Sequence, residues 1–150
     1  MKLAIASDHA GLVLKREVLD ALQKLGHQVE DLGAHDVTSV DYPDFAALVS
    51  RKVRDGLVDL GVLCCGTGIG MSMAANKFRG VRAAVCTSEF EARMTRLHND
   101  ANVLCLGERV IGPGQARAIA EVFVRTAFEG GRHQNRVKKI ALAEDENQRS

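Results

Sequence analysis

The chain has 150 residues and a formal net charge of +1, from 20 Lys and Arg against 19 Asp and Glu. One domain of this size buries about two-thirds of the surface that its unfolded chain exposes, so it needs no disulfide or metal to fold. The balanced charge argues against broad electrostatic binding to nucleic acid or to a membrane, and any bound anion must be held by a local cluster.

The four cysteines lie in apolar runs and lack the paired spacing of a zinc site. No apolar segment reaches the ~18 residues of a membrane span, and the stretch near the N-terminus is too short for a signal peptide. We therefore predict a soluble, cytoplasmic protein with reduced thiols and no metal site.

Short apolar runs alternate with segments of helical period along the chain. The apolar runs predict five strands, at Leu3–Ser7, Val29–Leu32, Leu60–Cys65, Arg82–Cys86 and Asn102–Leu106. The segments between them predict five helices, at Leu12–Leu25, Asp44–Asp55, Gly70–Asn76, Glu89–Leu97 and Pro113–Phe128. This alternation indicates a doubly wound parallel sheet, in which ligands bind at the carboxyl ends of the strands.

The first strand is followed by Asp8 and His9, within the sequence SDHAG. Asp8 has an ordinary structural explanation, because Asp is a preferred residue for capping the start of a helix. His9 is a less expected neighbour, since the positive end of a helix dipole disfavours a protonated imidazole unless an anion is present. A capping role and a site role both remain open for this pair.

The third strand runs into a glycine-rich stretch, LCCGTGIGMSMAANK, at 63–77. A P-loop would need a lysine directly after the glycines, and the first lysine is Lys77. A dinucleotide fingerprint starting at Gly66 would need glycine where Met71 stands. Two interpretations remain: a nest of backbone N–H groups for a phosphate or oxyanion, or a tight turn between strand and helix.

Cys65 lies at the mouth of this stretch. Side chains alternate along a strand, so Cys64 and Cys65 point to opposite faces and only the last residue reaches the open end. The dipole and unpaired N–H groups of the following helix favour a thiolate there, which could act as a base or a nucleophile. For Cys86 and Cys105 we expect inert buried thiols.

The segment 130–150 differs from the rest of the chain. Its helical period offers only Val137, Ile140 and Ala141 as an apolar face, which is too little to fold alone, so we expect it to dock on its own domain or on a partner. Arg132 and Arg136 are spaced i, i+4 and project from one face of a helix, beside His133. They form either a solvated basic face or a phosphate site.

These features together suggest a small phosphorylated substrate whose other end lies near Cys65. Proton transfer beside a carbonyl needs only a base, an acid and a group of donors for the oxyanion, with no cofactor. With these features the chain resembles the type B ribose-5-phosphate isomerases, whose family also includes the galactose-6-phosphate isomerase subunits. The resemblance rests on seven motifs in order: SDHAG at 7–11, DYPD at 41–44, CGTGIG at 65–70, AANK at 74–77, HND at 98–100, NVLCLG at 102–107 and GGRHQNRV at 130–137.

The resemblance implies an α/β fold, a Rossmann-like three-layer αβα sandwich with a five-stranded parallel sheet and a C-terminal helical arm. It implies one isomerase domain over 1–150, acting as a homodimer that can pair again into a tetramer, with the arm of about 130–150 docking on the partner subunit. The implied reaction interconverts D-ribose 5-phosphate and D-ribulose 5-phosphate through a cis-enediolate, without cofactor, in the pentose phosphate pathway. A hexose 6-phosphate remains an alternative substrate, and a non-catalytic phosphate-sensing module is a further one.

The resemblance also assigns roles to individual residues. Cys65 is the base, Thr67 assists proton transfer among the hydroxyls, and His98 opens the furanose ring. The early helix sequence IGMSMAA holds no carboxylate that could replace the thiol. The residues expected to bind the substrate are Asp8 near the ring oxygens, Tyr42 and Asn99 at the sugar, the backbone of Gly66, Gly68, Ile69 and Gly70 at the enediolate, and His9, Arg109, Arg132 and Arg136 at the phosphate.

Overall fold

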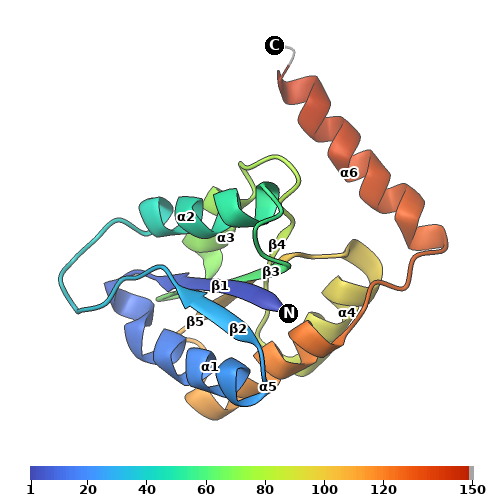
Figure 1. Ribbon diagram of the computed structural model, residues 1–150. Coiled ribbons are helices and arrows are strands. Elements are labelled where there is room, and N and C mark those ends of the chain that lie inside the picture. The colour runs from blue at the N-terminus through green and yellow to red at the C-terminus, as the bar shows by residue number, and fades with distance from the viewer. Residues whose placement is uncertain (149–150) are drawn as a thin grey trace.

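The computed structural model describes residues 1–148 and shows a parallel sheet between two layers of helices (Figure 1). The sheet has five strands in the order β2-β1-β3-β5-β4, with bounds β1 Lys2–Ser7, β2 Gln28–Asp31, β3 Leu60–Cys65, β4 Ala83–Val85 and β5 Val103–Gly107. The helices are η1 His9–Gly11, α1 Leu12–Lys24, α2 Tyr42–Arg54, α3 Ile69–Ala75, α4 Glu89–Asn99, α5 Pro113–Arg125 and α6 Arg132–Gln148. The predicted three-layer αβα sandwich is confirmed.

The predicted strands and helices all occur, and their ends differ by a few residues. Helix α2 begins at Tyr42 rather than Asp44, because Pro43 fits the first turn, where no N–H is needed. Helix α5 ends at Arg125 rather than Phe128, and the extended backbone of Thr126 leads the chain away towards two glycines of positive φ, Gly130 and Gly131.

The two faces of the sheet form two apolar clusters. One lies against α1, α4 and α5 and includes Cys64, and the other lies against α2 and α3 and includes Cys65. The two cysteines therefore point to opposite faces, as the strand pattern predicts. All four cysteines are free and buried. None of the described helices is both long enough and apolar enough to cross a membrane.

Two glycines let the backbone close tightly around the carboxyl end of β3. A Cβ on Gly11 would lie 2.5 Å from the carbonyl carbon of Cys64, and a Cβ on Gly107 would lie 2.6 Å from the carbonyl carbon of Thr67. Real side chains do not tolerate such separations from backbone atoms. These two positions bring the loops after β1, β3 and β5 into direct contact.

Helix α6 leaves the body beside α4 and stands out from it (Figure 1). Near its far end, Glu144 accepts from the backbone N–H of Gly80 at 3.0 Å, and Asp145 pairs with Arg79. A groove of about 490 Å³ lies between the helix and the body. Ile140 and Leu142 are 44% and 59% exposed, so the chain itself covers little of the apolar face of α6.

Replacing Gly11 by Ala should destabilise the fold, because the added methyl group meets the β3 backbone. We expect a loss of about 1–3 kcal/mol or more in the free energy of unfolding, measured by urea denaturation. Gly114 is the matched control, since a Cβ there meets only the tip of Arg117 at 3.9 Å. Gly114→Ala should be neutral or stabilise α5, and equal losses in both variants would contradict this account.

Candidate active site

The carboxyl edge of the sheet gathers the loops that follow β1, β3 and β5. Cys65 and Gly107 are paired in register as the last residues of their strands. The backbone N–H groups of Glu108 and Arg109 donate to the carbonyls of Cys65 and Gly66, both at 2.9 Å. The Glu108 carboxylate also accepts from the N–H of Leu14 at 2.9 Å, which ties this loop to the start of α1. Cys65 therefore lies within a fixed backbone frame.

The Cys65 sulfur receives a hydrogen bond from the chain that follows it. The N–H of Gly68 donates to Sγ at 3.1 Å, and Gly68 reaches this position with a left-handed φ of 79°. Such a donor stabilises a thiolate more than a thiol, because a hydrogen bond to the charged form is the stronger one. The side chain is 5% exposed, at the open end of the strand.

The other three thiols lie in a different environment. Burial raises the pKa of Cys64 and of Cys105 well above the usual range, and raises the pKa of Cys86 to about 12 with a smaller contribution from Glu91. These thiols stay protonated at neutral pH. The expected inert character of Cys86 and Cys105 agrees with this.

The glycine stretch uses two of its amides within the loop itself. Besides Gly68, the N–H of Ile69 donates to Oγ1 of Thr67 at 3.2 Å. Gly70 follows in the first turn of α3, where an amide has no acceptor within the helix. Within the predicted nest, the amides of Gly66 and Gly70 are therefore the candidates for contact with a substrate oxygen, while that of Gly68 faces the sulfur.

Asp8 and His9 line the same edge. The Asp8 carboxylate accepts from the N–H groups of Ala10 at 2.9 Å and Gly11 at 3.0 Å, so its capping role is confirmed. Nδ1 of His9 accepts from the N–H of Val40 at 3.2 Å, which joins this histidine to the loop between β2 and α2. With Nδ1 as acceptor, a neutral His9 carries its proton on Nε2.

The loop between β2 and α2 is anchored by a buried lysine. Lys15, 1% exposed, donates to the carboxylate of Asp31 at 2.7 Å and to the carbonyl of Ala34 at 2.5 Å. The loop ends at Tyr42, whose ring packs against α3: a Cβ on Gly70 would lie 2.8 Å from the ring's Cζ. Tyr42 is therefore held beside the glycine stretch, as a sugar contact requires.

Arg109 lies with the group of residues around Cys65. Its Nη1 is 3.3 Å from the position that a Cβ on Gly66 would take, so the guanidinium covers the residue next to Cys65. We expected Arg109 with the phosphate cluster. The structure separates it from Arg132 and Arg136, which begin α6.

A second group of expected site residues lies at the opposite edge of the sheet. His98 and Asn99 end α4 just before β5 begins at Val103, whereas Cys65 is level with the last residue of β5. Four residue steps of strand separate these levels by roughly 13 Å. We expected His98 and Asn99 in one site with Cys65. In a single chain, however, α4 runs back across the sheet and carries both residues to its amino edge.

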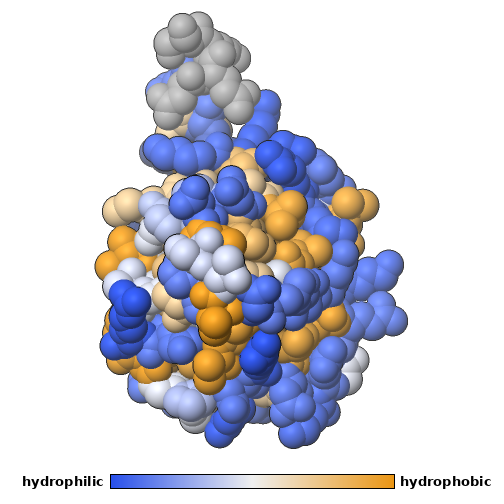
Figure 2. Space-filling view, turned by 90° about the vertical axis from the view of Figure 1, so that its left-hand side faces the viewer, coloured by the Kyte–Doolittle hydropathy of each residue, from blue (hydrophilic) through white to orange (hydrophobic). Residues whose placement is uncertain are grey.

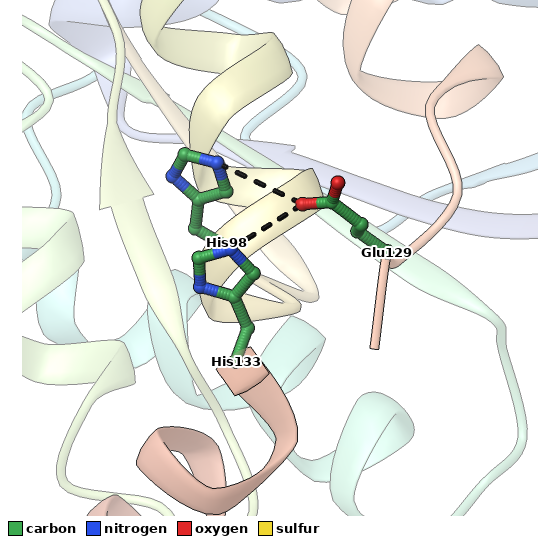
Figure 3. Close-up of side chains that lie close together, drawn as sticks. All are labelled: His98, Glu129 and His133. Carbon is green, nitrogen blue, oxygen red and sulfur yellow. Dashed lines mark ion pairs between the residues drawn. The ribbon is translucent and has the colours of Figure 1, made fainter. Parts of the chain in front are cut away.

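In this second group, His98 contacts two residues to which the sequence assigned no role of their own, His133 and Glu129. The rings of His98 and His133 stack with centroids 4.2 Å apart and planes 15° apart (Figure 3). Glu129, which carried no predicted role, lies 3.3 Å from Nε2 of His133 and 4.0 Å from Nε2 of His98. The available signal was its i, i+4 spacing from His133. Arg132 and Arg136 follow on the exposed surface of the same helix.

The chain matches a known protein family over most of its length. The sequence profile of the family described as Ribose/Galactose Isomerase matches residues 3–140. Ribose-5-phosphate isomerase B of Escherichia coli (strain K12) is 45% identical over 143 residues, covering 95% of this chain and 96% of that protein.

Two solved structures are similar over nearly the whole chain. Ribose-5-phosphate isomerase B of Clostridium thermocellum has a TM-score of 0.96 at 52% identity, covering 98% of this chain and 99% of the other. The enzyme of the same name from Mycoplasma genitalium, with ribulose-5-phosphate bound, has a TM-score of 0.93 at 46% identity and covers 97% of each chain.

Cys65 should be the thiol that alkylating reagents modify first in the folded protein. The Gly68 amide favours its thiolate, whereas burial keeps the other three cysteines protonated. Brief treatment with iodoacetamide at about pH 8, followed by peptide mass mapping, should find the label on Cys65. Equal labelling of all four cysteines before unfolding would contradict the assignment.

Proposed function

The chain belongs to the Ribose/Galactose Isomerase family, and on this basis we propose that it interconverts D-ribose 5-phosphate and D-ribulose 5-phosphate through a cis-enediolate. It is a sugar phosphate isomerase. The observation that supports this specific reaction is the hydrogen bond from the Gly68 amide to the Cys65 sulfur. It favours a thiolate that can act as a base without a metal ion or cofactor. The pathway we propose for it is the pentose phosphate pathway.

The proposed reaction is a proton transfer between two neighbouring carbons. The Cys65 thiolate takes the proton from C2 of the open-chain aldose while the C1 carbonyl oxygen gains negative charge. Thr67, 3.2 Å from the Ile69 amide and exposed at the loop, moves a proton between O1 and O2. The thiol then returns its proton to C1, and the ketose forms with no net change in the enzyme.

The remaining expected residues bind and open the sugar in this proposal. Asp8 and Tyr42 lie at the sugar, and the amides of Gly66 and Gly70 face the enediolate oxygen. His98 opens the furanose ring, with Asn99 beside it. The phosphate is held by His9 and by three arginines: Arg109, Arg132 and Arg136.

One chain alone does not assemble this site, because its two groups of residues lie at opposite edges of the sheet. We propose that the chain acts as a homodimer in which the His98 and arginine group of one subunit meets the Cys65 group of its partner. The exposed apolar face of α6 supports this arrangement, since a helix with so little covered apolar surface is stabilised by a partner. The 130–150 arm is then the docking element.

The size of the sugar is the open part of the proposal. The family description covers galactose as well as ribose, while the similar proteins named above are ribose-5-phosphate isomerases. This favours a pentose phosphate over a hexose 6-phosphate. A non-catalytic phosphate-sensing module would not need the Gly68 amide as a donor to the Cys65 sulfur.

The cytoplasmic location stays a prediction.

Replacing Cys65 should remove catalysis while leaving the fold intact. Purified protein is incubated with ribose 5-phosphate or allose 6-phosphate, and ketose formation is followed. The pentose phosphate should turn over, with solvent deuterium entering the product at the position of the migrating hydrogen. Cys65→Ala should lower kcat by about 10²–10⁴-fold or more, as expected when a general base is removed.

Cys65→Ser is the matched control for packing. The serine hydroxyl resembles the thiol in shape and can still accept a hydrogen bond from the Gly68 amide, but it does not ionise near neutral pH. It should be nearly as inactive as Cys65→Ala. An active serine or alanine variant would rule out the thiol as the base.

Mixing two inactive chains should restore activity if each site draws on both subunits. Arg132→Ala and Arg136→Ala together should raise KM for the sugar phosphate and leave little activity well below KM. When this double variant is refolded with Cys65→Ala, the mixed dimers hold one intact site, so about a quarter of wild-type activity per chain should return at random pairing. Mixtures that stay as inactive as their components would show that the two groups act within one chain or not at all.

A further inference from the structure

A carboxylate and a second imidazole surround His98 where α4 meets the start of α6 (Figure 3). The backbone N–H of Glu129 donates to the carbonyl of Leu97 at 3.2 Å, and Nε of Arg96 donates to the carbonyl of Thr126 at 3.0 Å. These bonds fix the segment that carries Glu129 against the end of α4. The backbone of Glu129 is therefore held against the end of α4, close to His98.

The protonation of His133 follows from its contacts. Nη1 of Arg136 lies 3.4 Å from Nδ1 of His133, and a guanidinium can only donate, so Nδ1 is the acceptor. The proton of a neutral ring then sits on Nε2, which faces Glu129 at 3.3 Å. Desolvation lowers the pKa of His133, with His98 and Arg132 adding to the effect and Glu129 opposing it. A neutral His133 therefore directs its Nε2 proton towards the Glu129 carboxylate.

The same three side chains could be considered as a metal site, because one ligand atom from each lies within 4.8 Å of the others. A metal-bound imidazole gives the lone pair of one nitrogen to the ion and donates its other N–H to an acceptor. Nδ1 of His133 instead faces a guanidinium, and Arg132 adds a second cation nearby. Two cations beside the ring therefore disfavour a bound metal ion at this place.

His98 is held on two sides by this arrangement. Its ring face stacks on neutral His133, and its Nε2 faces the Glu129 carboxylate at 4.0 Å. The other ring nitrogen, Nδ1, points away from Glu129 (Figure 3). The side chain is 39% exposed, so this outward nitrogen is accessible.

We propose that Glu129 is a positioning residue for ring opening: it holds His98, together with His133, so that Nδ1 is presented to the sugar. This inference rests on the proposed function. With the Nε2 proton directed at the carboxylate, Nδ1 carries the lone pair, which is the arrangement of a carboxylate that orients a histidine base.

The chemical step balances without a further reactant. Nδ1 of His98 takes the proton from O1 of the furanose while the O1–C1 bond becomes a carbonyl and the C1–O4 bond breaks. The electron pair of that bond goes to O4, to which His98 returns the proton. The product is the open-chain aldehyde that the Cys65 step requires.

The test separates ring opening from carbon proton transfer. Ribulose 5-phosphate has its C5 oxygen esterified and its carbonyl at C2, so it forms no furanose and its C1 hydrogen exchanges without any ring step. Glu129→Gln keeps the side-chain size and removes the charge. We expect it to lower kcat/KM for ribose 5-phosphate roughly 10- to 100-fold, part of the 10²–10⁴ typical of acid–base catalysis. Deuterium exchange at C1 of ribulose 5-phosphate, followed by NMR, should stay within about twofold of the wild type, a change of under 0.5 kcal/mol.

The controls distinguish this role from a structural one. Glu121→Gln removes a half-exposed carboxylate that pairs with Arg125 on α5, and should change neither rate. Glu129→Asp should recover part of the loss, and Glu129→Gln should add nothing in a His98→Ala background, because residues that act through one another are not additive. Parallel loss of both rates, or an unchanged ribose 5-phosphate rate, would overturn the proposal. Absence of wild-type turnover would instead refute the proposed function.

Discussion

The close contact of three backbone segments around the carboxyl end of β3 is the constraint on which the rest of the site depends. Gly11 and Gly107 lack the Cβ atoms that would collide with the carbonyls of Cys64 and Thr67. Their absence lets the loops after β1 and β5 enclose the last residue of β3. Cys65 is thereby kept nearly buried while its sulfur still meets the amide of Gly68. A reactive thiol needs both conditions, since an exposed thiolate oxidises and a fully buried thiol does not ionise.

The same contacts explain why the glycine stretch is not a nucleotide loop. A phosphate-binding loop presents several free amides to one anion. Here the amide of Gly68 serves the sulfur and that of Ile69 serves Thr67, so the loop is partly satisfied by its own side chains. The remaining amides, those of Gly66 and Gly70, suit a single oxygen atom rather than a chain of phosphates. The left-handed conformation of Gly68 is the feature that turns its N–H back to the sulfur.

The sequence predicted the layers of the fold well, because buried strands and amphipathic helices leave period and composition signals that tertiary contacts do not override. It predicted the position of Cys65 at the end of β3 and the cap at Asp8 because both depend on local geometry. It did not predict where His98 lies relative to Cys65 within one chain, because the position of a helix end relative to a strand end follows from helix length and direction. Glu129 was missed because its neighbours in space come from the ends of two different helices. The direction of the Arg109 side chain could not be predicted, because a long side chain has several directions available and packing over Gly66 selects one.

The separation of the two groups of residues has an energetic consequence for the isolated chain. Arg132 and Arg136 add positive charge to the first turns of α6, where the helix dipole disfavours it, and Ile140 and Leu142 remain exposed to water. Neither feature stabilises the chain on its own. Both become favourable once an anionic ligand and an apolar surface are present, and the proposed homodimer would supply that surface. In the proposed homodimer, the helix that carries the cations is also the helix that docks on the partner, so association of the subunits and assembly of the proposed phosphate site would be a single event.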